Sequence, residues 1–391
     1  MSKVTAKRLG DIVNLKRGYD LPENQRIPGP YPVISSAGIS GYHNEFKAEG
    51  KGVVTGRYGT LGEMYFVDGK YWPHNTSLYV TTFKGNDPKY IYYLLSCLGR
   101  IRTSDKSAVP GVNRNELHEM AVPVVDDKTQ QKKIAAVLSA LDAKIDCNNR
   151  INAELEAMAK TLYDYWFVQF DFPDANGKPY KSSGGKMVYN STLKREIPAG
   201  WRDSNILAVA DLLGGGTPTK KKPEFWNGNI PFFTPTDANG NIFKFATEDY
   251  ITDEGLKKSS TKLFEKNTIL ITARGSVGKL VLAGVDMAMN QSCYALRAKS
   301  GISHTFLFFL TKELIHHLQV KSSGSVFDSI VSNDIEFTIL AIPNTPLVEK
   351  FASIIEPAFE HIANNIRENQ QLTQLRDWLL PMLMNGQVTV N

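Results

Sequence analysis

A hydrophobic ladder occurs twice in this chain, and the second copy follows the first at an offset of 217 residues. The rungs alternate steps of four and three residues over 134–166 and again over 351–383. This 3.5-residue period is typical of a helix that packs along another helix. Each copy also carries a pair of asparagines at the same two rungs. The rungs that we assign to the helix–helix seam are Ile134, Leu138, Leu141, Ile145, Asn148, Asn152, Leu155, Leu162, Ile355, Ile362, Asn365, Asn369, Leu372 and Leu379.

The asparagine pairs lie at the centre of each ladder, which fits two helices that pair antiparallel within the one chain. In that arrangement Asn148 and Asn152 meet Asn369 and Asn365. A parallel pair would match the asparagines as well. Antiparallel pairing about a pseudo-twofold axis, however, places one globular unit at each end of the helix pair. Buried asparagine costs stability but fixes register. At about 1.5 Å per residue, the ladder predicts a rod of about 50 Å. The alternative is that each helix packs only on its own domain.

Composition limits the class of protein. The chain has 391 residues, enough for two or three domains that each bury a core. Its net charge of +5 permits a polyanionic partner without requiring one. The three cysteines, Cys97, Cys147 and Cys293, form no CxxC, so we expect neither a disulfide framework nor a zinc site. Because we find no signal peptide and no apolar run long enough to span a membrane, we expect a cytoplasmic protein.

Smaller repeats divide the rest of the chain into two globular units. Glycine-flanked turns at Arg57 and Arg274 are again 217 residues apart, and an Asn-x-Ser-x-Tyr string follows each turn. Short strands are predicted at 53–55, 63–67, 77–82, 268–272 and 280–282, and helices at 88–100 and 303–320. The fold class is therefore α+β, with mostly-β units. Our boundaries are 1–126 and 190–344 for the units, 127–170 and 345–388 for the long helices, and 171–189 for an exposed linker.

We find no catalytic signature in the sequence. There is no GxxxxGK[ST] phosphate loop, and the Gly-Ser-Val-Gly-Lys string at 275–279 is too short to be one, so we interpret it as a β-turn. Asp-Pro-Lys-Tyr at 87–90 resembles the Asp-Pro-Pro-Tyr loop of amino-methyltransferases, but it lacks the second proline and opens a helix. The histidines are scattered without an HExxH context. We therefore predict no catalytic residue and no metal site.

Basic and hydrogen-bonding loops occupy matching places in the two units. Glycine-turn amides can approach phosphate closely and lysines add a salt-dependent attraction, although solvated turns are the alternative. Arg57 and Arg274 can donate to guanine edges or phosphate, or pack beneath their own loops. Asn75, Asn290 and Gln291 have the amide geometry for adenine, or else satisfy strand-end backbone. The residues that we predict as nucleic-acid contacts are Lys16, Arg17, Tyr19, Arg57, Tyr58, His74, Asn75, Lys106, Ser107, Thr217, Lys220, Lys221, Lys222, Thr236, Asp237, Arg274, Ser276, Lys279, Asn290, Gln291, Lys321 and Ser322.

Taken together, the chain resembles the specificity subunit of Type I restriction–modification enzymes over essentially its whole length. The strings that carry the resemblance are Leu-Gly-Asp-Ile at 9–12, Gln-Gln-Lys-Lys-Ile at 130–134, and Gly-Gly-Gly-Thr-Pro at 214–218 with Phe-Trp and Ile-Pro following it. The second helix departs from the first at 346–350, Pro-Leu-Val-Glu-Lys, where the glutamine pair is absent. The two helices therefore need not offer identical surfaces to partners.

The resemblance implies two target-recognition domains that each read one half of a bipartite, asymmetric double-stranded DNA target, with the helices as conserved spacers. It also implies two modification (methyltransferase) subunits that hold S-adenosylmethionine, and restriction (motor-nuclease) subunits that use ATP and Mg²⁺. The specificity subunit itself would be non-catalytic and bind no cofactor directly. Two alternatives stay open at this point: a self-sufficient DNA methyltransferase or nuclease, and a coiled-coil adaptor that binds only protein.

Overall fold

The structure, a computed structural model, describes residues 4–57, 63–97, 113–321 and 328–390. The chain is α+β and divides into two compact units. Unit 1 comprises residues 1–146 and 370–391, and unit 2 comprises residues 147–369. Both long helices cross this division, so each contributes one part to each unit. In the described part of the chain, no helix is long and apolar enough to cross a membrane.

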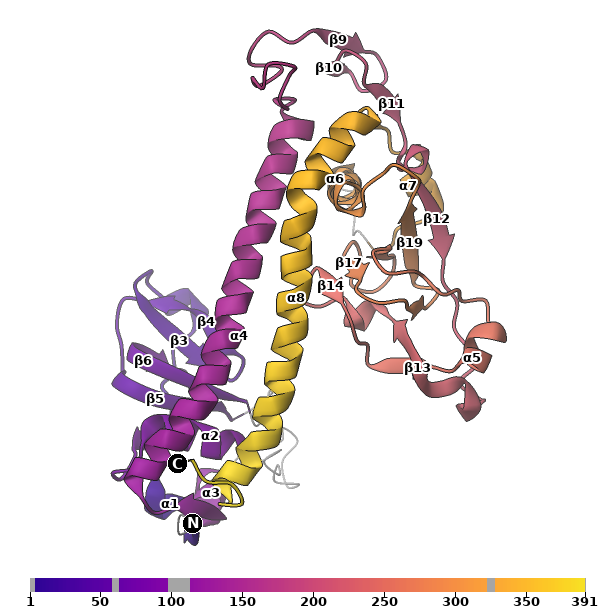
Figure 1. Ribbon diagram of the computed structural model, residues 1–391. Helices are drawn as coiled ribbons and strands as arrows, with labels where there is room; N and C mark the ends of the chain where they lie inside the picture. Colours follow the sequence, from indigo (N-terminus) through magenta and orange to yellow (C-terminus); the bar gives the residue numbers. More distant parts are fainter. Residues whose placement is uncertain (1–3, 58–62, 98–112, 322–327, 391) are drawn as a thin grey trace. The chain divides into compact units, whose positions relative to one another are not determined.

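Unit 1 is built on a mixed sheet in the order β2-β7-β5-β6-β3-β4. Figure 1 labels β3 to β6 of this sheet. α2 packs against β5 and β6, and Asp87 caps this helix by accepting from the backbone N–H groups of Lys89 and Tyr90. The predicted strands at 53–55, 63–67 and 77–82 are confirmed as parts of β5, β6 and β7. The bounds are β1 Val4–Arg8, α1 Leu9–Ile12, β2 Asn14–Arg17, η1 Glu23–Gln25, β3 Tyr31–Ser35, β4 Gly38–His43, β5 Ala48–Gly56, β6 Met64–Pro73, β7 Ser77–Thr82, α2 Pro88–Cys97, α3 Arg114–Glu119 and β8 Ala121–Val125.

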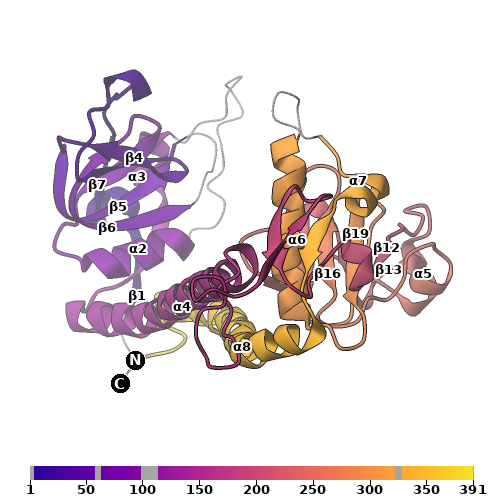
Figure 2. The same cartoon turned by 90° about the horizontal axis from the view of Figure 1, so that it is seen from above.

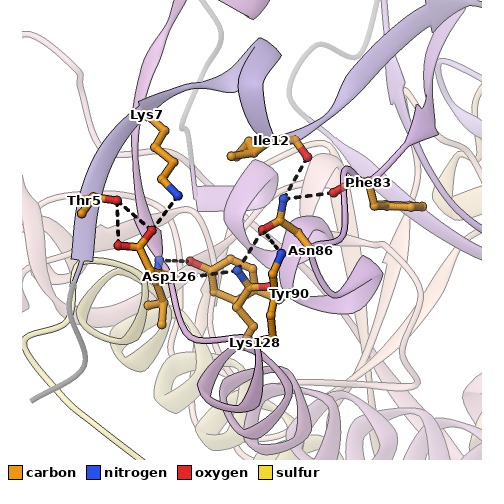
Figure 3. A network of polar contacts seen from close by, with 10 residues as sticks. Thr5, Lys7, Ile12, Phe83, Asn86, Tyr90, Asp126 and Lys128 are labelled. Atoms are coloured by element: carbon orange, nitrogen blue, oxygen red, sulfur yellow. Dashed lines mark hydrogen bonds and ion pairs between the residues drawn. The ribbon is translucent and has the colours of Figure 1, made fainter.

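A polar network ties the first strand of unit 1 to the start of α4 (Lys128–Tyr163) (Figure 3). β1 pairs antiparallel with β8. Asp126, just after β8, accepts hydrogen bonds from the Thr5 hydroxyl and forms an ion pair with Lys7 at 2.6 Å. Asn86 bonds the Ile12 carbonyl and accepts from Lys128 at 3.1 Å. Because these bonds join three segments distant in sequence, they fix where α4 leaves the unit.

The main sheet of unit 2 has the order β12-β19-β16-β17-β14, and its first four strands repeat the order β2-β7-β5-β6 of unit 1. α6 contacts β17 and β19. In unit 1, α2 contacts β5 and β6 in the same way (Figure 2). The predicted strands at 268–272 and 280–282 and the predicted helix at 303–320 are confirmed as β16, β17 and α6. The bounds are β9 Met187–Asn190, β10 Arg195–Pro198, β11 Arg202–Ser204, η3 Ile206–Ala208, β12 Ala210–Gly214, η4 Pro223–Phe225, β13 Trp226–Phe233, η5 Pro235–Asp237, β14 Phe243–Lys244, β15 Asp249–Ile251, α5 Asp253–Lys257, β16 Ile269–Thr272, β17 Leu280–Ala283, β18 Ala288–Met289, β19 Cys293–Ala298, α6 His304–Lys321, α7 Ser332–Phe337 and β20 Leu340–Ile342.

Within each unit, α4 lies beside α8 (Thr345–Met384). In unit 2, Asn365 donates to Asn152 at 2.9 Å and Asn148 donates to Asn369 at 2.9 Å. In unit 1, Arg376 donates to Asp142 at 3.0 Å. In unit 2 the later α8 residue, Asn369, meets the earlier α4 residue, Asn148, so the paired segments run in opposite directions.

The segment that follows α4 is held by its own contacts. α4 passes into one π-helical turn, η2 Asp164–Val168, and the side chains of 174–186 are mostly exposed. Phe172 stacks on Tyr180 with ring centroids 4.6 Å apart and on Trp201 at 5.8 Å. Hydrogen bonds from Ser182 lower the pKa of Asp171, whose carboxylate accepts from both its N–H and its hydroxyl. These contacts give this polar stretch, which we predicted as a linker, a defined conformation.

Candidate nucleic-acid interface

The predicted contact residues of unit 1 meet where β2 and β5 end and β7 begins. In the sheet, Lys16 and Val54 both pair with Tyr79, one from each side of β7. The chain then turns so tightly at Gly18 that a Cβ there would lie 2.1 Å from the carbonyl oxygen of His74, so only glycine fits. The Arg57 N–H donates to the Thr76 carbonyl at 2.8 Å. Folding therefore gathers β2, β5 and the 74–76 turn at one edge.

Hydrogen bonds connect the side chains at this edge. The Arg17 Nε donates to the Asn75 carbonyl at 3.4 Å, and the Asn75 amide donates to Asp20. Lys16 donates to the Tyr19 hydroxyl at 3.2 Å, and the Tyr19 and Tyr79 hydroxyls are 3.3 Å apart. The hydrogen bonds from Tyr79 and Lys16 lower the pKa of Tyr19, whereas burial raises the pKa of Tyr79.

His74 also lies at this edge. Its backbone bridges to Tyr19 and its Nδ1 lies 3.1 Å from the Thr76 hydroxyl. Burial, followed by the positive charge of Arg26, lowers the pKa of His74. The positive charge of the edge therefore comes from lysine and arginine side chains.

Unit 2 has the same arrangement in the same register. Gly214 and Ile271 both pair with Tyr294, as Lys16 and Val54 pair with Tyr79. A Cβ at Gly215 would lie 2.1 Å from the carbonyl oxygen of Asn290, which repeats the close approach seen at Gly18. The Thr217 hydroxyl donates to the Gln291 side chain across this contact. The predicted residues on both sides of the turn are thus brought together.

The basic loop at 219–222 is held by aromatic side chains. The Trp226 indole N–H donates to the Thr219 carbonyl at 3.2 Å, and the Lys220 ammonium lies 5.7 Å from the Trp226 ring centroid. Lys222 lies 5.1 Å from the centroid of Phe225. The Lys221 side chain is exposed. Fixing the loop in this way reduces the entropy that would be lost when it binds a partner.

The turn at 234–237 uses its polar side chains internally. The Asp237 carboxylate accepts from the Thr234 N–H and hydroxyl and from the Glu248 N–H at 3.0 Å, and the residue is only 4% exposed. Thr236 remains exposed, with its hydroxyl 2.8 Å from that of Thr234. Of these two predicted residues, Thr236 is the one whose side chain can reach a ligand.

The loop around Arg274 follows β16 and reaches a cleft. The Arg274 N–H donates to the Ser292 carbonyl, next to the Asn290 turn, and its backbone bridges to Ser329. Ser276 and Lys279 are exposed beyond it. Lys279 lines a cleft of about 400 Å³ between this loop and α6. Lys321, at the end of α6, is exposed, whereas Tyr58, Lys106, Ser107 and Ser322 lie outside the described residues.

The sequence alone did not identify two side chains at the unit 1 edge, Tyr79 and Arg26. Tyr79 holds Tyr19, and the repeated Asn-x-Ser-x-Tyr string was the signal that could have identified it. Arg26 carried no such signal because it stands in no repeated string and comes to His74 only through the fold. Among the described residues, no group of three or more histidine, cysteine or acidic side chains could hold a metal ion.

Comparison with known proteins places this arrangement in a family. The model of the Type I restriction modification DNA specificity domain matches residues 1–157 and again residues 198–374. The chain belongs to this family. The match therefore covers most of both units and of both long helices, and it occurs twice, as the internal repeat does.

Individual members of the family are similar at moderate identity. The MjaIX specificity subunit of a Type I restriction enzyme from Methanocaldococcus jannaschii is 27% identical over 310 residues, which cover 77% of this chain and 69% of that protein. The HindI specificity subunit from Haemophilus influenzae is 23% identical over 357 residues and covers 77% of each. The crystal structure of the S subunit of a Type I restriction–modification system from M. genitalium has a TM-score of 0.59 and 16% identity, and covers 98% of this chain and 96% of that one. The last likeness establishes the shared fold.

Proposed function

We propose that this chain is the DNA-specificity subunit of a Type I restriction–modification complex, and that each unit reads one half of a bipartite, asymmetric target. The observation that carries the proposal is the duplicated edge. The two sheets share the order of four strands and the register at Tyr79 and Tyr294, and they present basic and amide side chains at equivalent turns. Because the side chains at these turns differ between the units, the two half-sites should differ in sequence.

Methylation mapping of the host genome tests this function directly. The expected result is one methylated motif with two defined halves separated by a spacer of fixed length. Deleting the gene should abolish methylation at that motif, and restoring it should recover the motif. If deleting the gene abolished methylation at a continuous motif instead, or abolished it at no motif, the result would contradict the proposal.

We further propose that α4 and α8 form an intramolecular antiparallel coiled coil that sets the spacer between the half-sites. The contacts of Asn148 with Asn369 and of Asn152 with Asn365 support this pairing. A helix of this length, about 50 Å, exceeds one turn of B-DNA, about 34 Å. Four residues inserted at matched positions in both helices should change the preferred spacer, whereas the same insertion at Gly177, in an exposed turn, should not. An unchanged spacer in the helix variant would contradict the proposal that the length of the helices sets the spacer.

The chemistry, in this proposal, belongs to partner chains. Two modification subunits would bind S-adenosylmethionine and restriction subunits would bind ATP and Mg²⁺, while this chain acts in the cytoplasm without a catalytic residue. Labelled S-adenosylmethionine and target DNA should give methyl transfer only when modification subunits are added. Transfer by the pure chain would favour the self-sufficient methyltransferase instead.

A protein-only adaptor is the second candidate, and binding measurements separate it from a DNA reader. An assembled complex that contacts phosphates releases counterions, so its DNA affinity should fall steeply and linearly on a log–log plot against salt. An adaptor would leave the DNA affinity of the modification subunits unchanged when this chain is added. The target found by methylation mapping is the DNA to use.

A further inference from the structure

We propose that Arg26 anchors a phosphate of the DNA backbone at the unit 1 edge, an assignment that rests on the proposed function. Arg26 follows η1 and is not among the residues that the sequence predicts to bind nucleic acid. Its partner Ser40 follows Ile39 in β4, which pairs with Ile34 of β3. The Ile34 carbonyl accepts from the His74 N–H at 2.8 Å, so the hairpin that holds Arg26 is bonded to the 74–76 turn. The fold thus adds a fixed guanidinium to the edge formed by Lys16, Arg17 and Asn75.

The position of the Arg26 side chain is set by the β3–β4 hairpin. Its Nη1 donates to the Ser40 carbonyl at 2.6 Å. Gly41 leaves room for it, because a Cβ there would lie 3.0 Å from Nη1 and the glycine has a φ of +141°. The neighbouring Ile27 N–H donates to the buried His43 ring at 3.1 Å, which fixes the backbone that carries Arg26. The guanidinium is therefore held in place by the folded hairpin.

The charge of Arg26 is left without a carboxylate. Within the described residues, no acidic oxygen lies within 4 Å of it, and its buried Nε has no hydrogen-bond partner. Asp20, an acid at this edge, accepts from the Asn75 amide. A guanidinium with a purely structural role would be expected to satisfy its donors, because an unsatisfied buried donor destabilises a fold. A half-buried, unpaired cation also acts more strongly on an external anion than a solvated one.

A phosphate fits this site better than a base edge. Reading guanine requires the two terminal donors of an arginine to reach into the groove together, whereas one Nη of Arg26 is already engaged by Ser40. Phosphate oxygens lie on the outside of the duplex and accept from any donor direction. Contacts of this kind set the register of the protein on DNA and carry no sequence information.

The test uses the full chain assembled with its modification subunits and a duplex that carries the mapped target. For Arg26→Gln, the slope of log affinity against log salt should decrease by about 0.9, the value for one phosphate, and affinity should fall roughly 3–10-fold at low salt. The methylated motif should stay the same. Arg26→Lys keeps the charge and should keep the slope, and it also serves if Arg26→Gln does not fold.

The matched control is Arg8→Gln, which removes a charge from unit 1 at an exposed residue already paired with Glu119 at 3.2 Å. It should bind like the wild type. Replacing single phosphates of the duplex by methylphosphonates should reveal one position that weakens the wild type and Arg26→Lys but not Arg26→Gln. Wild-type slope in Arg26→Gln, or a relaxed base in its methylated motif, would overturn the phosphate assignment. A wild-type complex that recognises no bipartite target would instead overturn the proposed function.

Discussion

The contact between α4 and α8 is polar in unit 1 and aromatic in unit 2 at places that the internal repeat makes equivalent. In unit 1, Asp142 on α4 meets Arg376 on α8 at 3.0 Å. The positions 217 residues away are Phe359 and Ala159, which share the main core of unit 2 and are fully buried. The same ladder therefore supports two kinds of packing, and the residues that each unit packs against the two helices determine which one occurs.

The difference comes from the helix that each unit packs against the seam. In unit 1, Tyr93 of α2 donates to Asp142 at 2.5 Å, which makes the acid the centre of a hydrogen-bonded triad. In unit 2, Phe308 and Phe309 of α6 each lie 5.9 Å from the ring of Phe359. At this place unit 1 therefore uses an ion pair and hydrogen bonds, which salt weakens, whereas unit 2 uses apolar burial, which salt does not weaken.

The largest expected effect follows from removing the Phe359 ring from the aromatic contact in unit 2. Phe359→Ala should lower the free energy of unfolding of unit 2 by about 3–5 kcal/mol, because it removes a fully buried ring and leaves a cavity. Denaturant melts followed by hydrogen exchange would measure the loss and locate it in unit 2. Ile354→Ala, at a residue 47% exposed on the same helix, is the control and should change little. A comparable loss in the control would mean that the helix as a whole had been damaged.

Breaking the polar contact should cost less. Asp142→Ala leaves the Arg376 guanidinium and the Tyr93 hydroxyl without their acceptor, so we expect a loss of about 1–3 kcal/mol. A double-mutant cycle with Arg376→Ala should give a coupling that shrinks as salt is raised.

The matched control for this cycle is the exposed pair Arg8–Glu119, whose side chains are 66% and 67% exposed. Its coupling should be close to zero, as for most surface ion pairs. If Asp142 and Arg376 coupled no more strongly than this control, the polar description of the unit 1 seam would be wrong.

The asparagine rungs of unit 2 test a third kind of contact, where two packed helices bury amides. Asn152 and Asn365 are 5% and 6% exposed, and the Nδ2 of Asn152 has no partner within the described residues. Replacing both by leucine should therefore raise stability by roughly 1 kcal/mol, because apolar packing replaces an imperfectly bonded polar pair.

The cost of that leucine pair should appear in pairing specificity, because buried asparagine restricts register and oligomeric state. Light scattering of the double variant should detect species larger than the monomer. The single variant Asn152→Leu is the control. It removes the acceptor of the buried Asn365 amide and should therefore be destabilised. A less stable double variant would mean that the asparagines contribute net stability and not only register.

Periodicity made the helices and strands predictable because the spacing of apolar residues is itself the cause of those elements. The 3.5-residue ladder marks the faces that α4 and α8 bury, and the strings rich in β-branched residues at 53–55 and 77–82 lie within β5 and β7. Glycine-rich turns next to these strands identified the two edges. What a residue contacts along its own helix or strand is thus contained in the sequence.

Contacts between distant segments were not predictable in this way. Tyr79 and Tyr294 occupy the same place in repeated strings and the same register, yet Tyr79 packs with Ile34 and Tyr71 while Tyr294 packs on the core that includes α6. The face that a strand residue takes depends on which elements cover the sheet. Arg26 and Asp142 were missed for the same reason, since their partners Ser40 and Tyr93 come from other elements.

The smallest effect that we predict is a pH dependence in unit 1. The His118 Nε2 accepts from the Leu15 N–H at 2.9 Å, and burial together with the charges of Arg114 and Lys84 lowers the pKa of His118. The unfolded chain, with an ordinary histidine pKa of about 6.5, then binds the proton more readily. Stability is therefore complete above that pH and declines as pH falls through it towards the lowered pKa of the folded state. Thermal unfolding of His118→Gln should depend less on pH in this range than that of the wild type, and the exposed His361→Gln should behave like the wild type. Equal pH dependence in all three would show that this hydrogen bond is not the source.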